Sequence, residues 1–351
     1  MVLLSPHKSP YPGRSFFIPD VITHQRDPFP YEADIRSIVS LPPEYCYMAH
    51  QFIDEIKRAI ETSLPASSAI VGKIIQAIHN QSTSAKDIAA IIEHDPPLTA
   101  KLLKVSNSAY YGSSSTITSL QRAVVVLGLD TLRELVTTIS VINSLSAADD
   151  NSDIDRIGFW YHSVGTAKAC QMITEITRIE RSDVAYVVGL LHDIGKILLT
   201  LSFPEQYVKV IKLAEIKQTR IILAERRLLN TDHTMIGKIL CNMWGLPEDI
   251  STAILYHHDP MEVPRGSQKL ARIVELGDYM CRKAKIGNPG DDATPQPSRA
   301  TLALLGPSDE KVKENFMKVF RALYESKQEI EEFFGTLDSD KNQAEKADAQ
   351  A

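Results

Sequence analysis

The stretch Gly189-Leu190-Leu191-His192-Asp193-Ile194-Gly195-Lys196-Ile197 places a histidine and an aspartate next to each other inside an apolar run. The run extends from Val184 to Leu201, and its composition otherwise predicts a buried helix. Burying both polar side chains is costly unless other groups pair with them. This stretch alone allows two interpretations: a core histidine beside an Asp-x-Gly turn, or part of a metal site.

Other histidines and an aspartate in the chain indicate that the pair is not isolated. Five of the ten histidines lie between residues 162 and 258, each in a helix-like segment. The candidate metal ligands are His162, His192, Asp193, His233, His257, His258 and Asp278. We expect different helices to position them, which is how metal sites inside helical bundles are built.

Histidine and carboxylate ligands without cysteine suit a divalent metal such as iron, manganese, zinc, magnesium or nickel. Seven such ligands are too many for one octahedral ion that also binds water and substrate, but they suffice for two ions if one aspartate bridges them. Two neighbouring ions stabilise the attacking and leaving oxygens of phosphoryl transfer and lower the pKa of a bridging water. Residue chemistry thus indicates a metal-dependent phosphohydrolase, although spacing alone does not bring the seven side chains together.

Length and charge limit the classes of protein to which the chain can belong. Its 351 residues suffice for two domains, or for one large helical domain with an extension. Apolar content of 44% and charged content of 23% are typical of a soluble globular protein. The net charge of −6 gives no general attraction to nucleic acid or to an anionic membrane, so we expect no direct binding to either.

Cysteine usage and the first residues favour a cytoplasmic location. The four cysteines (Cys46, Cys170, Cys241 and Cys281) are far apart and no two form a CxxC, so we expect them to be reduced. The start Met-Val-Leu-Leu-Ser-Pro is too short and lacks the basic residues of a signal peptide. We also expect no membrane span, on the view that no apolar run approaches roughly 18 residues.

Apolar residues recur with a helical period, and no convincing stretch alternates as a strand would, so we predict an all-α multi-helix bundle. Eight prolines among the first 50 residues prevent a continuous helix there. The predicted parts are an extended proline-rich arm over residues 1–50, an N-terminal helical subdomain over 51–147, a metal-site subdomain over 155–285, a linker or surface loop over 286–308, an amphipathic helix over 309–335 and a disordered tail over 336–351.

Capping residues predict where several helices begin and end. Ser84 followed by Asp87 predicts one helix start, and the capping box Thr118-Ser119-Leu120-Gln121 predicts another. Gly128 is expected to end that second helix, and Asp130 to cap the next.

Three polar segments have less specific interpretations. The polar-aromatic loop 107–112 is either a turn over packed aromatics or a binding surface. The acidic connection 147–155 lacks calcium-loop spacing, so we expect a solvated loop and a helix cap. The charged run from Arg220 to Arg227 predicts a solvated helix face.

Residues 157–285 resemble the HD superfamily of metal-dependent phosphohydrolases. The ligand order H…HD…H…HH…D is the one seen in its HD-GYP branch of cyclic dinucleotide phosphodiesterases. Upstream, the segments EHDPPLTAKLLKVSNSAYYG (93–112) and ITSLQRAVVVLGLDTLRELV (117–136) resemble the HDOD domain, the HD-related output domain of bacterial signalling proteins. The resemblance covers about residues 54–285 and implies an HD-type helical bundle.

The resemblance also implies a role for each candidate residue. It assigns His162, His192, Asp193 and Asp278 to one metal, with Asp193 as the bridge, and His233, His257 and His258 to a second. Lys196 matches a lysine that approaches the substrate phosphate in related phosphodiesterases, so Lys196 and Asp193 are the candidate catalytic residues. From the residues alone, His233 could simply begin a helix, and Lys196 could cap a turn or pair with Asp193. His257 and His258 need not both point inward, since neighbours on a helix point about 100 degrees apart.

Two features bear on the choice between regulation and catalysis. HDOD domains often lack several ligands and are generally regarded as regulatory modules without catalysis, whereas this sequence keeps all seven. The Gly-Tyr-Pro of HD-GYP proteins is absent after His257-His258, where Asp259-Pro260-Met261-Glu262-Val263-Pro264 follows.

We expect a bacterial signal-transduction output or regulatory protein whose His/Asp pocket holds one or two divalent ions. Its expected partners are signalling proteins or a nucleotide-type ligand. The first alternative is a phosphohydrolase that acts on a nucleotide or a cyclic dinucleotide. The second alternative is an interaction scaffold without metal.

Overall fold

The computed structural model describes residues 58, 67–80, 83–93, 96–107, 117–145, 154–263 and 268–334. The chain divides into two units, Met1–Cys46 and Tyr47–Ala351, and all of the described residues belong to the second unit. The predicted arm over residues 1–50 and the predicted tail over 336–351 therefore lie outside the described residues.

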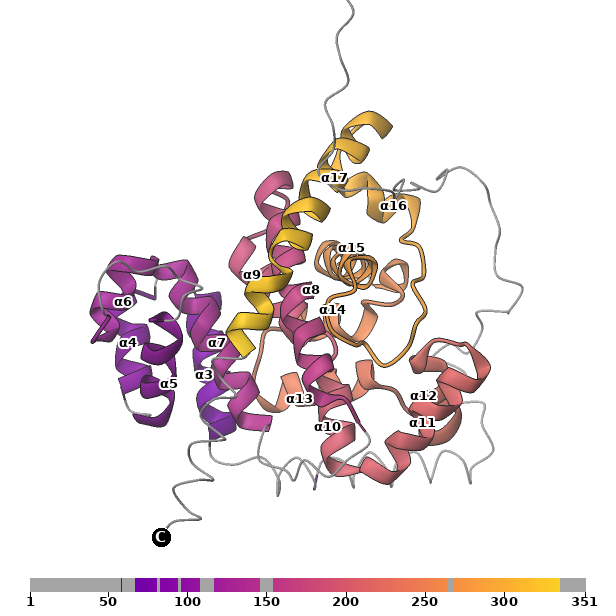
Figure 1. Ribbon diagram of the computed structural model, residues 1–351, viewed down its shortest axis with the longest axis horizontal. Coiled ribbons are helices and arrows are strands. Elements are labelled where there is room, and N and C mark those ends of the chain that lie inside the picture. The colour runs from indigo at the N-terminus through magenta and orange to yellow at the C-terminus, as the bar shows by residue number, and fades with distance from the viewer. Residues whose placement is uncertain are drawn as a thin grey trace, which may run out of the picture. The chain divides into compact units, whose positions relative to one another are not determined.

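Every regular element among the described residues is helical, which confirms the all-α prediction (Figure 1). The helices of the first group are α3 (Ser67–His79), α4 (Ala85–Glu93), α5 (Pro96–Ser106), α6 (Leu120–Leu127) and α7 (Leu129–Leu145). The helices of the second group are α8 (Arg156–Thr177), α9 (Ser182–Leu191), α10 (Ile194–Ser202), α11 (Pro204–Lys217), α12 (Ile221–Leu229), α13 (His233–Met243), α14 (Glu248–Tyr256), α15 (Gln268–Ala284), α16 (Arg299–Leu302) and α17 (Asp309–Glu325), with short 3-10 turns η2 (Pro260–Glu262) and η3 (Ala303–Leu305).

Polar side chains hold the connections of the first group. The Ser84 amide donates to Asp87 Oδ2 (2.9 Å) and the Asp87 amide donates to Ser84 Oγ (3.3 Å), as the capping box predicts. Asn107 joins the end of α5 to the start of the next segment. Its Nδ2 donates to the carbonyl oxygens of Leu103 and Ile117, and its Oδ1 accepts from the Ile117 amide. The rest of the polar-aromatic loop, residues 108–112, lies outside the described residues.

Two of the predicted caps around α6 and α7 need correction. Ser119, not Thr118, is the N-cap of α6, because the Ser119 side chain accepts a hydrogen bond from the Arg122 amide. Gly128 ends α6 as predicted, with a φ of 86° that favours glycine. Asp130 lies within the first turn of α7, where its charge suits the helix dipole, instead of at the cap.

The second group is built around α8, which packs against both α9 and α15, while α3 and α7 of the first group also contact α9. Asp155 begins α8, because its side chain accepts a hydrogen bond from the Gly158 amide at 2.7 Å; this confirms the helix cap expected in the acidic connection. Helix α10 lies against α13 at Gly195, where a Cβ atom would come within 2.0 Å of the His233 carbonyl oxygen. Glycine at this position therefore lets the start of α10 reach the start of α13.

The apolar run around His192 and Asp193 is two helices and not one. Helix α9 ends at Leu191, α10 begins at Ile194, and Asp193 occupies the N-cap position with φ −103° and ψ 13°. By length and composition, Ser182–Ser202 is apolar enough to cross a membrane, with a mean hydropathy of 1.6, so the expectation that no run reaches this length is wrong. However, 94% of the 18-residue window that gives this hydropathy is buried inside the protein, as in a helix of the protein core.

The charged run 220–227 was expected to be a solvated helix face, and this is wrong for half of α12. Ile221, Ile222 and Ala224 are buried, and Glu225 has no exposed surface. Three of the four cysteines, Cys170, Cys241 and Cys281, are buried and free, as expected for core thiols. Cys46 lies outside the described residues.

The segment expected as a linker or surface loop packs against the second group. Ile286 and Pro297 are buried, whereas residues 287–296 between them are half-buried or exposed; we call residues 287–296 the strap. The predicted C-terminal helix divides at Ser326, because α17 ends at Glu325 and residues 327–334 form a further helical segment. Gly335, its expected end, lies outside the described residues.

Candidate metal centre

Asp193 lies at the centre of the histidine cluster. The break between α9 and α10 exposes its carboxylate to side chains from several helices, yet only 2% of the residue is exposed to solvent. Its Oδ2 lies 3.2 Å from His192 Nε2 and 3.9 Å from His162 Nε2. Its Oδ1 lies 3.3 Å from His233 Nε2 and 3.8 Å from His257 Nε2. The two oxygens therefore face two different groups of histidines.

The first group consists of His162, His192 and Asp193, whose ligand atoms all lie within 4.8 Å of one another. His162 comes from the middle of α8 and His192 from the end of α9. Asp278 of α15 adjoins this group, with its Oδ1 at 2.9 Å from His162 Nε2. These are the four residues that the resemblance assigns to one metal.

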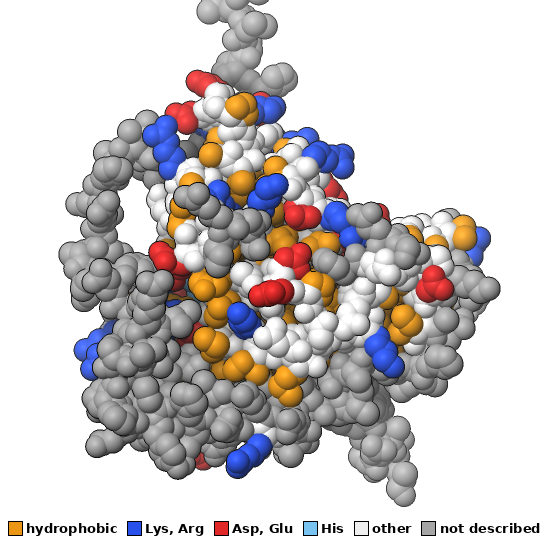
Figure 2. Space-filling view, turned by 180° about the vertical axis from the view of Figure 1, so that it is seen from behind, with side chains coloured by type: hydrophobic (Ala, Val, Ile, Leu, Met, Phe, Trp, Pro, Cys, Tyr) orange, Lys and Arg blue, Asp and Glu red, His pale blue; other side chains and the backbone are white. Residues whose placement is uncertain are grey.

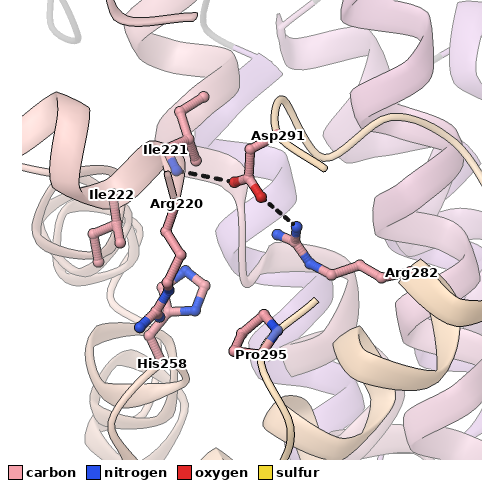
Figure 3. Close-up of a pocket in the computed structure, with 7 residues that line it drawn as sticks. All are labelled: Arg220, Ile221, Ile222, His258, Arg282, Asp291 and Pro295. Atoms are coloured by element: carbon pink, nitrogen blue, oxygen red, sulfur yellow. Dashed lines mark hydrogen bonds and ion pairs between the residues drawn. The ribbon is translucent and has the colours of Figure 1, made fainter. Parts of the chain in front are cut away.

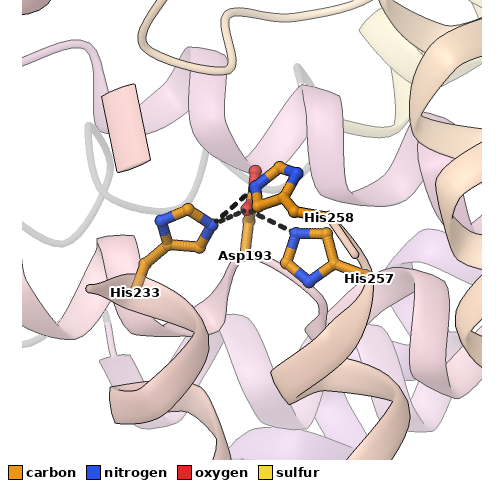
Figure 4. Close-up of side chains that lie close together, drawn as sticks. All are labelled: Asp193, His233, His257 and His258. Atoms are coloured by element: carbon orange, nitrogen blue, oxygen red, sulfur yellow. Dashed lines mark hydrogen bonds and ion pairs between the residues drawn. The ribbon is translucent and has the colours of Figure 1, made fainter. Parts of the chain in front are cut away.

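The second group consists of Asp193, His233, His257 and His258, with the same close spacing of ligand atoms (Figure 4). His233 begins α13, and His257 and His258 follow the last residue of α14. His233 Nε2 and His258 Nε2 lie 3.1 Å apart. His257 and His258 both turn toward Asp193, although they are adjacent in the sequence and follow the last residue of α14.

Several polar atoms of this cluster make no hydrogen bond within the described structure. They are both ring nitrogens of His162, His192 Nε2, His257 Nε2 and Asp193 Oδ1, all buried. Buried polar atoms are costly when they lack a partner. Unpaired atoms of metal-ligating type that converge from different helices fit one or two divalent metal ions.

The protonation states favoured by burial are those that bind metal. Burial lowers the pKa of His162, and it holds the pKa values of His257 and His258 well below their usual range. These imidazoles are therefore neutral and keep a lone pair. Burial alone would raise the pKa of Asp193, but the neighbouring His192 and the Lys196 ammonium group outweigh it and hold that pKa well below its usual value. The carboxylate is thus ionised.

Asp278 is kept ionised by a neighbour outside the ligand set. Burial would raise its pKa, but the guanidinium of Arg282 and the close contact with His162 hold the pKa well below its usual value. Arg282 lies one turn further along α15, and its Nε donates to Asp278 Oδ1 at 2.8 Å. Arg282 was not among the residues predicted for this site.

Hydrogen bonds hold the sides of the His192 and His257 rings that face away from the cluster. His192 Nδ1 lies 2.8 Å from the Gly189 carbonyl oxygen, and His257 Nδ1 lies 2.8 Å from the Ile254 carbonyl oxygen. A carbonyl oxygen only accepts, so each Nδ1 carries the proton and each Nε2 keeps its lone pair toward the cluster. Such contacts fix both the tautomer and the direction of a metal-binding ring.

Glu225 performs the same task for His233, and the sequence interpretation missed it. Its Oε2 lies 2.6 Å from His233 Nδ1 and accepts a hydrogen bond from the His233 amide, and its Oε1 accepts from Tyr207 Oη at 2.6 Å. One signal was available: Glu225 lies four residues after Ile221 and four before Leu229, so it shares their buried helix face.

Lys196 is directed into the protein. Its Nζ donates to Asp193 Oδ2 at 2.7 Å and to the Pro289 carbonyl oxygen at 3.0 Å, and the residue has no exposed surface. Pairing with Asp193 was one of the roles that the sequence left open for this lysine. Its role in approaching a substrate phosphate stays a prediction.

A small pocket lies on the outer side of the second ligand group (Figure 3). It is lined by Arg220, Arg282, Asp291 and His258, among others. Asp291 belongs to the strap and lies between Arg282 and the first residue of α12. The pocket has no room for a water molecule, since its free volume is about 0 Å³.

The outer surface differs in character from this buried centre. On the face drawn in Figure 2, Lys and Arg side chains lie scattered among acidic and apolar ones over the described surface. That part of the face presents no patch of a single charge, in keeping with the small net charge of −6.

The structure thus brings together all seven side chains that the sequence singled out. Six of them form the two groups that share Asp193, and Asp278 contacts His162. The residues that the sequence interpretation missed are Tyr207, Arg220, Glu225, Arg282 and Asp291. The number and identity of the ions, and any catalytic role, stay predictions.

Comparison with known proteins gives the chain its relatives. The family model of the HDOD domain matches residues 64–260. An uncharacterised protein from Treponema pallidum (strain Nichols) is 30% identical over 220 residues, which are 60% of this chain and 40% of that protein. The chain therefore spans less than half the length of this curated relative.

Solved structures share the fold. An HDOD domain protein of unknown function from Geobacter sulfurreducens matches with a TM-score of 0.66 at 27% identity, covering 82% of this chain and 96% of that one. A candidate signal transduction protein from Marinobacter aquaeolei VT8 matches with a TM-score of 0.69 at 23% identity, covering 86% and 68%. A candidate phosphohydrolase from Shewanella amazonensis SB2B matches with a TM-score of 0.59 at 22% identity, covering 81% and 98%.

Proposed function

We propose a function from one premise, which is that this chain belongs to the HDOD domain family. The protein is a regulatory module of signal transduction whose core holds divalent metal. The observation that carries the proposal is a ligand cluster which is complete yet closed. All seven candidate ligands meet around Asp193, and six of them are at most 5% exposed. The expected partners of the protein are signalling proteins or a nucleotide-type ligand.

The closure of the centre favours regulation over turnover. A hydrolase must bring its substrate into contact with the reacting groups. Here the Lys196 ammonium group is bound on both sides by Asp193 and Pro289, and the pocket beside His258, which Asp291 lines, has no room for a water molecule. A centre closed in this way suits a protein whose shape or stability responds to metal or ligand.

The residues present fit the metal well enough to name its ligands. His162, His192, Asp193 and Asp278 would hold one ion, and Asp193, His233, His257 and His258 would hold the second. When bound, such ions supply positive charge that polarises phosphoryl oxygens and activates water. The protein's own contribution is to direct the Nε2 atoms of His192 and His257 inward and to keep Asp193 ionised.

The second candidate function is hydrolysis of a phosphate ester. One observation favours it: a single carboxylate faces both ligand groups and also contacts a buried lysine. That arrangement suits two ions that share a phosphate, with Lys196 as a further positive charge. Turnover by the metal-loaded protein separates the two candidates.

The test combines metal analysis with a turnover assay on the full chain. The wild type is loaded with manganese, iron or zinc, freed of excess metal, and compared with Asp193→Asn and with the exposed control Asp292→Asn. We expect about two ions per chain in the wild type and in the control, fewer in Asp193→Asn, and no hydrolysis of bis(p-nitrophenyl) phosphate or of cyclic dinucleotides by any of them.

Other results would contradict the proposal in different ways. Hydrolysis by the wild type that is lost in Asp193→Asn would make the chain a phosphohydrolase. Absence of metal from the wild type under all three loadings would make it an interaction scaffold.

A further inference from the structure

We propose that the strap, residues 287–296, is a built-in inhibitor of the metal centre, in which the Asp291 carboxylate occupies the place of an external phosphate group. The inference rests on the proposed function, because it concerns access to the same centre. The chemical class of the excluded ligand is a phosphate or a phosphate monoester, and the strap must move for such a ligand to enter.

The Asp291 carboxylate is bound as an anionic ligand would be. Its Oδ1 accepts a hydrogen bond from Arg282 Nη1 at 3.0 Å, and its Oδ2 accepts one from the Ile221 amide at 3.0 Å (Figure 3). Ile221 is the first residue of α12, and the free amides at a helix start attract anions. Only 4% of the Asp291 side chain is exposed, so this is a buried ion pair and not a surface contact.

The bound carboxylate is connected to both ligand groups of the centre. Arg282, which holds Asp291 through Nη1, also donates through Nε to Asp278, the neighbour of His162. Asp291 also lines one pocket together with Arg220 and with His258 of the second group. An anion in the place of the Asp291 carboxylate would therefore share Arg282 with Asp278 and line the same pocket as His258.

The strap also occupies the lysine of the centre. The Pro289 carbonyl oxygen accepts a hydrogen bond from Lys196 Nζ at 3.0 Å, two residues before Asp291. Moving the strap would release three donors at once: the Lys196 ammonium, the Arg282 guanidinium and the Ile221 amide. Charged donors of this kind, together with a helix start, are what proteins use to bind phosphoryl oxygens.

The strap is fastened at its ends and held by polar contacts in its middle. Ile286 and Pro297 are buried, whereas residues 287–296 are half-buried or exposed as whole residues, although the Asp291 side chain is enclosed. Gly287 passes so close to α8 that a Cβ atom would lie 2.2 Å from the His162 amide nitrogen, which fixes the strap's start beside a metal ligand. The middle depends on hydrogen bonds and one ion pair, which an anion with more charge can replace without opening the apolar core.

The first test measures binding of inorganic phosphate to metal-loaded protein by calorimetry, in wild type, Asp291→Asn and Asp292→Asn. Asp292 is the matched control, because it is the adjacent aspartate and its side chain is exposed. The Asp291→Asn substitution keeps the shape of the side chain but removes the charge that competes with phosphate. We expect phosphate to bind Asp291→Asn about tenfold more tightly than wild type, and Asp292→Asn to bind like wild type.

Metal content measured in the same samples separates the two proposals. Equal metal content with equal phosphate affinity in all three proteins would overturn the strap inference and leave the metal-holding function standing. Absence of metal from all three would instead overturn the proposed function.

A second measurement uses the wild type alone and does not depend on how the variant folds. Hydrogen exchange is followed at the amides of residues 287–296, with phosphate and with chloride at equal ionic strength. We expect phosphate to speed exchange in the strap while the amides of α8 stay unchanged. Unchanged or slower strap exchange in phosphate would overturn the inference, whether or not metal is present.

Discussion

Replacing Glu225 with glutamine tests how the protein directs a histidine into its metal centre. Glu225 is fully buried and accepts three hydrogen bonds: from Tyr207 Oη, from the His233 amide and from His233 Nδ1. Glutamine has nearly the same shape and can keep an oxygen toward His233. It removes the negative charge that orients the ring and strengthens its Nε2 as a ligand.

The structure indicates the size of the effect. A hydrogen bond to a charged group contributes about 1.5–3 kcal/mol and a neutral one about 0.5–1.5. Losing the charge therefore weakens each of the three bonds by about 1–1.5 kcal/mol and costs on the order of 3–4.5 kcal/mol of unfolding free energy. Outer carboxylates of this kind alter metal affinity by about 10–100-fold. Glu225→Ala is less informative, because it would leave three buried donors unpaired at a cost of about 1–3 kcal/mol each. The summed cost approaches the whole unfolding free energy of a domain, so the variant could simply fail to fold.

The assay is a competition titration in which a chromophoric chelator and the protein compete for manganese or zinc, with urea unfolding of the metal-free protein alongside. The control is Glu215→Gln, since Glu215 is exposed on α11. We expect Glu225→Gln to bind metal about 10–100-fold more weakly than Glu215→Gln, beyond any loss in stability. Equal metal affinity in the two variants would refute the orienting role of Glu225.

Three other perturbations test separate parts of the structure. Gly195→Ala would place a Cβ 2.0 Å from the His233 carbonyl oxygen and push α10 away from α13. We expect this substitution to lower the unfolding free energy by about 1–3 kcal/mol and to weaken metal binding. Stability and metal content equal to those of the wild type would contradict this close approach. Asp193→Asn leaves the buried Lys196 without its carboxylate, so urea unfolding of the metal-free protein should show an unfolding free energy lower by about 3–5 kcal/mol. The double variant Asp193→Asn/Lys196→Met should largely recover this free energy. A double variant as unstable as Asp193→Asn would count against the pairing. Burial raises the pKa of Glu275 to about 7, although the hydrogen bond from Thr301 opposes this shift. The folded protein therefore holds the Glu275 proton more tightly than the unfolded chain does. The resulting contribution to stability is full below pH about 4.5 and is lost as the pH rises through about 7. Between pH 5 and 8, wild type should therefore lose stability relative to Glu275→Gln in urea unfolding, and parallel stability curves for the two proteins would refute the shift.

The sequence could predict the helical class and the ligand set, but for different reasons. Helical periodicity and caps such as Ser84 and Gly128 are local, so they hold wherever the helices pack. The convergence of His162 with Asp278, more than a hundred residues later, is a tertiary fact, and only the resemblance to HD-type motifs predicted it. The break at His192 and Asp193 was only one of two interpretations of the sequence, as an Asp-x-Gly turn, because an apolar run shows burial and not where a helix stops.

Glu225 and Asp291 show what composition cannot reveal. A charged run normally faces water, yet Glu225 is drawn inside by Tyr207 and His233, which lie on other helices. Proline and glycine in residues 286–308 correctly exclude a long helix there, but they do not tell whether the segment is loose or packed. That depends on Arg282 and the start of α12, which give Asp291 its partners.

The most direct test of a metal-holding core is anomalous diffraction from crystals of the manganese- or zinc-loaded protein. We expect two anomalous peaks, one on either side of Asp193. One would lie by His162 and His192, and the other by His233, His257 and His258. Peaks only at surface sites, or none within reach of Asp193 in fully loaded protein, would rule out a metal-holding core and leave the histidines as a structural cluster.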